Sequence, residues 1–297
     1  MENTGYLIKT YKDANPYSST FNQTKTERIY DTTTCPLPLT SDIKYIVEIP
    51  TDNFYDSYSI HKNYGDEIIV DWGDGVIESI GGTITEIHHT YTLAGSYQVN
   101  ITVEVFGAGF EANSIGISAR ATEIISYSLP SKVDAFSRLF ASPNYIITEL
   151  NPVFNITGGV DTYYSFLENS TTLTRVNDGT FDNQFTNTNT IYRLFYNCPN
   201  LTYIPENTLA SFGGDNISNI LNNNPKLELN INNFFSYVDL SKITNISFAF
   251  SNCAKITGEA LPIINQLSHL TVSTTYLSAF SGCTSLSDFD QIPSGWK

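Results

Sequence analysis

The sequence predicts a mostly β protein with an extended N-terminal arm, a small β-sandwich and a short solenoid of repeats. β-Branched runs that alternate with period two occupy residues 41–118, whereas a motif that recurs every 26 to 30 residues occupies residues 119–297. Period-two runs are typical of half-buried strands, and a repeat of this length is typically one turn of a solenoid. Residues 1–40 follow neither pattern, so we assign them to the arm.

The composition is that of a folded protein that does not bind nucleic acid. The hydrophobic fraction is 41% and the chain has 19 Tyr and 18 Phe, which argues against disorder. The formal net charge of −15 repels a phosphate backbone and an anionic membrane surface. No basic segment followed by an apolar one opens the chain, and no stretch has the apolar length to span a bilayer. We therefore expect no nucleic-acid partner and no membrane insertion.

The first forty residues are rich in Thr, Asn, Ser and Tyr. The run 31–39 has no regular period, and Pro36 and Pro38 favour an extended chain. Such a segment becomes ordered by leaning on another surface. We expect it to be the attachment segment for partner proteins, with a flexible tail or an additional strand as the alternatives.

Three short period-two runs predict the sandwich, at residues 43–49, 67–71 and 97–103. Between them lie Asp-Trp-Gly-Asp-Gly at 71–75 and His-Thr-Tyr-Thr-Leu-Ala-Gly-Ser-Tyr-Gln-Val at 89–99. These motifs resemble the polycystic-kidney-disease (PKD) type of immunoglobulin-like domain, in which a Trp-Gly-Asp-Gly turn precedes a His-x-Tyr stretch and a Gly before the last strand. The resemblance implies an immunoglobulin-like sandwich that acts as a spacer or interaction module without catalysis.

Two groups in this region resemble metal sites. Asp71, Asp74 and Glu78 are potential calcium ligands, but a Gly-Asp-Gly sequence is first of all a tight turn whose Asp caps the local backbone. His88 and His89 have no nearby Cys, and adjacent residues of a strand face opposite ways. We expect structural roles for the carboxylates and a packed or hydrogen-bonded role for one histidine, with no bound metal.

The repeat unit begins with a large apolar residue and ends with Leu or Ile six positions later, with small or polar residues between. The six units are Phe140–Ile146, Leu167–Leu173, Phe195–Leu201, Leu221–Leu227, Phe250–Ile256 and Phe280–Leu286. One such turn is too small to bury its own apolar side chains, so the turns must stack. We expect the leading and trailing residues of each unit to point inward and to form columns.

Two polar positions within the unit recur in register. The repeated asparagines are Asn169, Asn197, Asn223 and Asn252. Their amides are expected to satisfy backbone groups of a neighbouring turn. The next position holds Cys in three units, at Cys198, Cys253 and Cys283. With no Cys-x-x-Cys pair and no His in register, we expect small buried side chains here rather than metal ligands or nucleophiles.

Arg193–Pro205, Ala249–Ile256 and Ala279–Leu286 resemble BspA-like leucine-rich repeats, whose mark is a Phe-x-x-Cys-x-x-Leu run followed by Ile-Pro. The resemblance covers about residues 119–297 and implies a short leucine-rich-repeat solenoid. Three units have another residue in place of the Cys, namely Pro143, Ser170 and Asn224.

No sequence motif indicates catalysis. A phosphate-binding loop, a His-Glu-x-x-His zinc helix and a Gly-x-Ser-x-Gly elbow are all missing from the sequence, which has four His. The sequence does not exclude a pair of carboxylates for glycoside hydrolysis, because the two partners can be distant in the chain. We expect no enzyme and no cofactor. Exposed tyrosines of the repeats form the predicted binding surface, with core packing as the alternative: Tyr163, Tyr164, Tyr192, Tyr196 and Tyr203.

These features favour a non-enzymatic structural protein of a bacteriophage virion. The arm would attach it to other proteins of the capsid or tail, and the repeats would face outward as a fibre or decoration that contacts a host glycan or protein. Both resembled families occur on phage and bacterial surfaces, and the lack of a visible export signal favours assembly in the host cytoplasm. The alternative is a bacterial cell-surface adhesin that binds a host protein or glycan.

Overall fold

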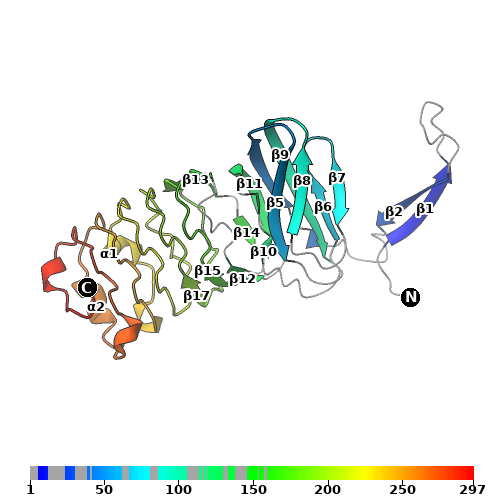
Figure 1. Cartoon of the computed structure of the whole chain (residues 1–297). Helices are drawn as coiled ribbons and strands as arrows, with labels where there is room; N and C mark the ends of the chain where they lie inside the picture. Colours follow the sequence, from blue (N-terminus) through cyan, green and yellow to red (C-terminus); the bar gives the residue numbers. More distant parts are fainter. Residues whose placement is uncertain are drawn as a thin grey trace.

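In the computed structural model the described residues are 6–12, 24–30, 39–40, 42–61, 67–80, 86–105, 114–115, 117–118, 120–129, 133–137, 146–152, 154–156 and 159–297. They are mostly β, with only short helices. Figure 1 shows an elongated arrangement, with strands β1 and β2 at one end, then two sheets, then a series of stacked turns that reaches the C-terminus.

Strands β1 (Tyr6–Lys12) and β2 (Thr24–Tyr30) pair antiparallel along their whole length. Strand β3 (Leu39–Thr40) belongs instead to the largest sheet, where it pairs with β9. The predicted extended arm thus contains regular strands. Sequence reasoning missed β1 and β2 because their Lys- and Thr-rich runs do not alternate between apolar and polar residues.

The largest sheet has the strand order β14-β11-β4-β9-β6-β7, with β3 alongside β9. Its remaining strands are β4 (Asp42–Ile49), β6 (Glu67–Asp71), β7 (Ile77–Ile80), β9 (Gly95–Val105), β11 (Ala121–Leu129) and β14 (Phe154–Ile156). Strand β4 shows the predicted alternation, since Ile43, Tyr45 and Val47 are fully buried and the residues between them are not. Because β11 and β14 join this sheet, it does not end at the predicted boundary of residue 118.

A second sheet has the order β10-β5-β8 and faces the first. Its strands are β5 (Phe54–His61), β8 (Glu86–Tyr91) and β10 (Ser114–Ile115). Trp72, just after β6, stacks on His89 of β8 with ring centroids 4.7 Å apart and planes 11° apart. Two sheets that bury side chains between them are compatible with a β-sandwich. We call these two sheets the two-sheet region.

The described residues 133–137, 146–152 and 159–297 form consecutive turns held together by parallel pairing, and we call them the turn stack. One parallel ladder joins β12 (Val133–Ser137), β15 (Val160–Tyr164) and β17 (Thr190–Tyr192), and continues through bridges from Thr190 to Asn216 and Asn245. A second ladder joins β13 (Glu149–Leu150) to β16 (Arg175–Val176) and continues to Tyr203. Each turn therefore satisfies the backbone of the next, as parallel strands require.

The leading residues of the repeat units form the core of the turn stack. Leu167, Phe195, Leu221, Phe250 and Phe280 are all at most 2% exposed. Their backbone N–H groups each donate to a carbonyl of the following turn at 2.8–2.9 Å. The rings of Phe250 and Phe280 stack with planes 4° apart. The predicted inward column is confirmed for these units.

The trailing residues confirm the second column, with one correction. Leu173, Leu201, Leu227 and Ile256 are at most 1% exposed, and Leu286 is 4% exposed. In the first unit the buried residue is Ile147, not the predicted Ile146, because the N–H of Thr174 bonds to the carbonyl of Thr148 and so aligns Ile147 with Leu173. Phe140 lies outside the described residues.

The repeated asparagines hold a special backbone conformation, which the sequence did not reveal. Asn169, Asn197, Asn223 and Asn252 all have φ between 56° and 65°, a left-handed conformation that Asn tolerates better than most residues. We expected these amides to satisfy backbone groups of a neighbouring turn, but the amides of Asn197 and Asn223 bond to side chains instead. The Asn197 amide donates to the Asn169 side chain at 2.6 Å and the Asn223 amide to that of Asn197 at 2.5 Å. The result is a ladder of amides along the surface.

The cysteine position supplies a buried hydrogen-bond donor. The thiols of Cys198, Cys253 and Cys283 are buried and donate to the carbonyl of the leading residue one turn earlier, at 3.0, 2.9 and 2.9 Å. Asn224, in the same register, donates to the carbonyl of Phe195 at 2.7 Å. The prediction of small buried side chains is confirmed, and the donor role explains why Asn replaces Cys here.

Among the described residues, the short helices lie in the later turns. Helix α1 (Ile231–Phe234) is capped by Asn230, whose side chain accepts from the N–H groups of Asn232 and Asn233. Helix α2 (Leu261–Gln266) begins with two backbone N–H groups at residues 260 and 261 that donate to the carboxylate of Asp288. Short 3-10 segments lie at Leu240–Lys242, Ser273–Thr275 and Phe289–Gln291.

Aromatic packing joins the two parts of the chain. Strand β14 pairs parallel with β11, which brings Phe154 opposite Tyr127. The ring of Phe154 lies 5.6 Å from that of Tyr127 and 5.7 Å from that of Phe166, which lies two residues after β15. A continuous core of this kind restricts motion of the turn stack against the two-sheet region.

Candidate functional site

The five tyrosines predicted to form a binding surface do not lie together. Tyr163 is 2% exposed and packs edge-on against Phe166 and Phe185, with centroids 5.4 and 4.9 Å away. Burial also raises the pKa of its hydroxyl. The prediction that Tyr163 is part of the exposed surface is wrong, because it alternates with the exposed Tyr164 along β15 and so faces the core.

Three of the other tyrosines form one strip on the surface. Tyr164 stacks on Tyr192 with centroids 4.9 Å apart. The guanidinium of Arg193 lies 4.9 Å from the ring of Tyr192 and 4.8 Å from that of Tyr196, and it bonds to Glu168 at 3.3 Å. In the strip of Tyr164, Tyr192, Arg193 and Tyr196 only Tyr164 is exposed, and the other three residues are half-buried against one another.

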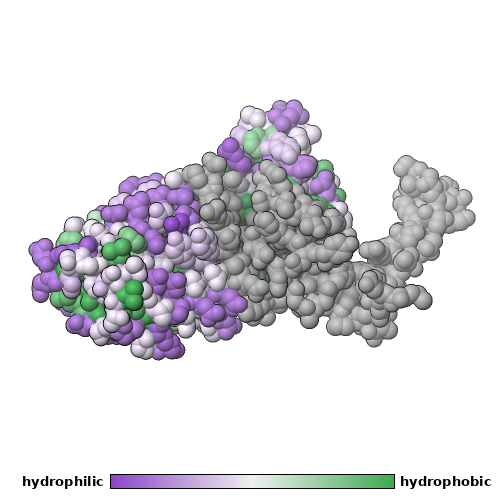
Figure 2. Space-filling view, turned by 60° about the horizontal axis from the view of Figure 1, so that its bottom comes forward, coloured by the Kyte–Doolittle hydropathy of each residue, from purple (hydrophilic) through white to green (hydrophobic). Residues whose placement is uncertain are grey.

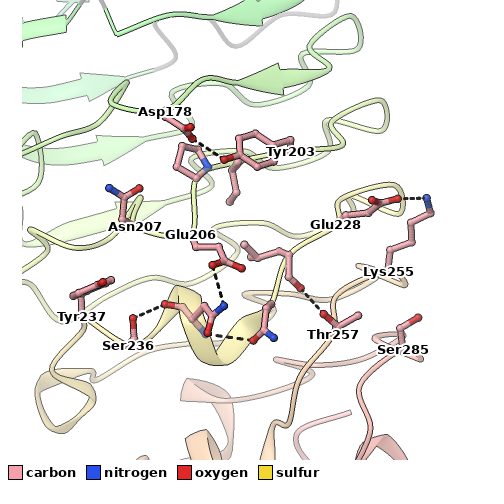
Figure 3. Close-up of a pocket in the computed structure, with 15 residues that line it drawn as sticks. Asp178, Tyr203, Glu206, Asn207, Glu228, Ser236, Tyr237, Lys255, Thr257 and Ser285 are labelled. Carbon is pink, nitrogen blue, oxygen red and sulfur yellow. Dashed lines mark hydrogen bonds and ion pairs between the residues drawn. The ribbon is translucent and has the colours of Figure 1, made fainter.

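Tyr203 lies apart from this strip and lines a groove of about 890 Å³. Its hydroxyl donates to Asp178 at 2.6 Å, and the guanidinium of Arg175 sits 3.9 Å from the centre of its ring. The hydrogen bond to Asp178 and partial burial raise the pKa of Tyr203. Two contacts thus hold the ring in place and leave it part of the groove wall (Figure 3).

The groove follows the second parallel ladder across successive turns. The turn after Leu201 contributes Tyr203 and Glu206, and helix α1 contributes Asn233, which donates to Glu206 at 2.9 Å. Lys255 of the next turn bonds to Glu228 at 2.7 Å. Figure 3 places Glu206 between Tyr203 and α1, with Lys255 and Tyr237 on opposite sides. Tyr237 is 65% exposed.

Sequence reasoning found Tyr203 but missed the other groove residues, because they occupy variable positions within or between the repeat units. A signal was nevertheless present. Tyr203 and Glu228 follow the buried Leu201 and Leu227 by one or two positions, and Lys255 precedes the buried Ile256. Polar residues that flank one buried column must share a surface of the stack, one rung apart.

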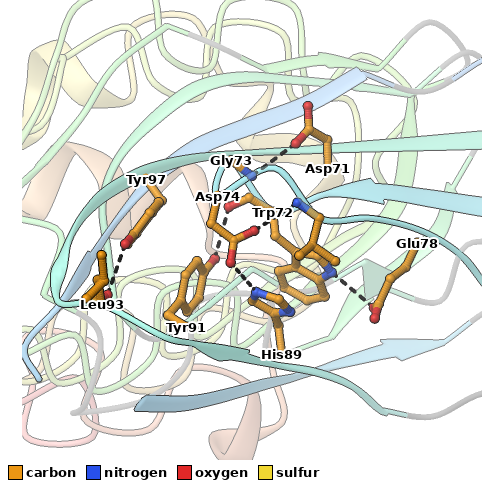
Figure 4. A network of polar contacts seen from close by, with 10 residues as sticks. Asp71, Trp72, Gly73, Asp74, Glu78, His89, Tyr91, Leu93 and Tyr97 are labelled. Atoms are coloured by element: carbon orange, nitrogen blue, oxygen red, sulfur yellow. Dashed lines mark hydrogen bonds and ion pairs between the residues drawn. The ribbon is translucent and has the colours of Figure 1, made fainter. Parts of the chain in front are cut away.

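The three carboxylates that we considered as calcium ligands, and expected to have structural roles, have partners within the protein (Figure 4). Asp71 accepts from the N–H of Gly73 at 3.0 Å, Asp74 from the N–H of Val76 at 3.1 Å, and Glu78 from the Trp72 indole at 3.0 Å. The interpretation of Asp74 as a turn cap is confirmed. In the described ranges, no three His, Cys, Asp or Glu side chains gather in a way that would hold a metal ion.

His88 and His89 face opposite ways, as expected for neighbours on a strand. His88 is exposed beside Tyr55, whereas His89 is buried and bonds to the Asp74 carboxylate at 2.8 Å. Burial by itself would raise the pKa of Asp74, but the bonds from His89 and from the Val76 N–H outweigh it and lower the pKa. The prediction of one packed, hydrogen-bonded histidine is confirmed for His89.

The described cysteines lack the character of nucleophiles. Burial raises the pKa of the Cys198 and Cys283 thiols to about 12 and that of Cys253 well above its usual range. A reactive cysteine needs a lowered pKa and access to solvent. Cys35 lies outside the described residues.

Comparison with known proteins gives no match, whether to family models, to curated proteins or to solved structures. Across the part of the chain that the structure describes, no helix combines the length and the apolar character needed to cross a lipid bilayer.

Proposed function

We propose that this chain is a non-enzymatic structural protein of a bacteriophage virion, in which a PKD-type immunoglobulin-like sandwich carries a short solenoid of BspA-like leucine-rich repeats. The observation that carries the proposal is the turn-to-turn hydrogen bonding of residues 159–297. A stack of this kind builds a long, regular surface whose exposed positions are independent of its core. Such surfaces serve contact with other molecules.

Convergence of the two halves of the PKD-like motif supports the sandwich assignment. Asp74 of the Trp-Gly-Asp-Gly turn bonds to His89, which begins the His-x-Tyr stretch, and Tyr91 of that stretch donates to the Trp72 carbonyl at 3.3 Å. Residues 15 and 19 positions apart along the chain thus hold one corner together. Hydrogen bonds between the turn and the His-x-Tyr stretch suit a rigid spacer.

The placement of the elements supports attachment at one end and display at the other. Strands β1 and β2 and the last turns lie at opposite ends of the molecule (Figure 1). Phe154 couples the two-sheet region to the turn stack through Tyr127 and Phe166. A rigid connection keeps a displayed surface at a fixed distance from its attachment point.

Fractionation of an infected culture tests the proposal. Quantitative mass spectrometry of gradient-purified particles should find the chain at a constant ratio to the main capsid protein. Recovery of the chain only in cell envelopes would contradict the proposal and favour the adhesin.

A deletion tests the attachment end. Removing residues 1–30, which hold β1 and β2 but not β3, should abolish incorporation into particles while circular dichroism shows the remaining domains folded. Incorporation of the shortened chain at the level of the wild type would place the attachment elsewhere.

A further inference from the structure

We infer that the groove of the turn stack binds a neutral oligosaccharide. The inference rests on the proposed function, since it names the ligand of the displayed surface. The groove volume of about 890 Å³ lies in the range of natural ligand sites, and its lining combines rings with many polar groups.

The aromatic part of the groove is preorganised. Tyr203 is held by Asp178 through its hydroxyl and by Arg175 against its ring. Binding of a ligand therefore costs no further side-chain entropy at this residue. Tyr237 supplies a second, largely exposed ring. Sugars carry flat apolar C–H faces, and a fixed ring beside an open groove offers the complementary surface.

The polar part of the groove offers donors and acceptors side by side. Glu206 and Asn233 form one such pair, and Glu228 and Lys255 form another. A carboxylate has two oxygens and about four acceptor positions. Neighbouring sugar hydroxyls can therefore donate to the carboxylate and accept from the amide or ammonium of the same pair.

The bonding of the carboxylates favours a neutral ligand over a peptide rich in Lys or Arg. Asp178 accepts from the Tyr203 hydroxyl, Glu206 accepts from the Asn233 amide and Glu228 pairs with Lys255, although the whole chain carries −15. A site for a polycation would present carboxylates that have no donor within the protein. A site for an anion would not be lined by three carboxylates.

The carboxylates suit binding rather than hydrolysis. A glycosidase needs one carboxylic acid with a raised pKa, usually through burial. Glu228 is exposed, and its hydrogen bond from Lys255 lowers its pKa. Glu206 is also exposed.

Calorimetry on the intact chain tests the inference, with short linear oligomers of glucose, mannose, galactose and N-acetylglucosamine as probes. At least one should bind, and Tyr237→Ala and Glu206→Gln should each weaken binding by about tenfold. Both side chains are exposed, so neither change should unfold the chain. Tyr164→Ala, an exposed tyrosine of the strip, is the matched control and should bind as the wild type does.

Three results would overturn the inference: no binding of any oligomer, binding that survives both groove substitutions, or loss of binding in Tyr164→Ala alone. Tighter binding of a Lys-rich peptide that Tyr237→Ala weakens would overturn it in favour of a protein ligand. Chromatography of the incubated oligomers separates this inference from the proposed function. Shortened products would refute the non-enzymatic function and keep the groove as the sugar site, whereas binding failure leaves the particle assay unaffected.

Discussion

Replacing Asn224 by Ala should destabilise the turn stack more than an ordinary polar-to-Ala change. Asn224 is fully buried and makes three bonds: its amide donates to the carbonyls of Phe195 and Leu221, and its oxygen accepts from the N–H of Cys198. Leu221 keeps another partner in the thiol of Cys253. The substitution therefore leaves two buried backbone groups without a hydrogen-bond partner, namely the Cys198 N–H and the Phe195 carbonyl.

The magnitude follows from those two groups. A buried polar group left without a partner costs about 1–3 kcal/mol, so the pair costs about 2–6 kcal/mol. That is a large part of the roughly 5–15 kcal/mol by which a domain is stable. The matched variant is Asn224→Cys, the residue found in this register elsewhere. Its thiol can donate to Phe195 as Cys253 donates to Leu221 at 2.9 Å, so we expect a loss of about 1 kcal/mol.

Urea unfolding measures both variants, with circular dichroism and tryptophan fluorescence as parallel probes. Trp296, whose carbonyl accepts from Phe280 in the last rung, reports on the end of the stack. The midpoint of Asn224→Ala should fall well below that of Asn224→Cys. Equal midpoints for the two variants, or a loss below about 0.5 kcal/mol for Ala, would refute the idea that a buried donor is required in this register.

Three further predictions concern the corner of the two-sheet region and the thiols. Gly73→Ala should lower the thermal midpoint more than Gly75→Ala, because both glycines have positive φ but only at Gly73 does a Cβ meet the Gln98 carbonyl; equal losses would contradict this. The pKa of Asp74 is lowered below its ordinary 3.8, so its stabilisation is complete above that value and is lost as pH falls through the folded pKa. The thermal midpoints of the wild type and Asp74→Asn should therefore converge below about pH 4, and a gap that persists unchanged would speak against it. The thiols of Cys198, Cys253 and Cys283 should resist iodoacetamide in the native protein and react in urea, as peptide mapping will show; native labelling of any of them at the rate of a free thiol would disprove their burial.

The periodicity of the sequence was enough to predict the core of the turn stack. Each turn must bury apolar residues against its neighbours, so Phe195, Leu221 and Phe250 recur at the same register and can be recognised as core residues from the sequence. The first unit shows the limit of this reasoning. Ile146 and Ile147 are adjacent and both apolar, and only the bond between Thr174 and Thr148 decides which one enters the column.

The same limit of sequence reasoning applies to the candidate sites. Tyr163 and Tyr164 are indistinguishable by residue type, and the pleat of β15 decides that one is core and the other surface. The asparagine register was visible in the sequence, but its left-handed backbone was not. Asn serves several structural roles, so its presence does not by itself predict a positive φ.

The sequence by itself determined most of the columns, the buried cysteines, the turn cap at Asp74 and one packed histidine, because burial and tight turns restrict which residues can occupy those positions. The groove was decided by the tertiary structure. Its polar side chains, such as Glu206 and Lys255, are exposed and free of burial constraints, and the stacking of the turns brings them together, with helix α1 placing Asn233 against Glu206. Residue type shows which positions flank a buried column, but the packing of the whole stack decides which of them line one groove.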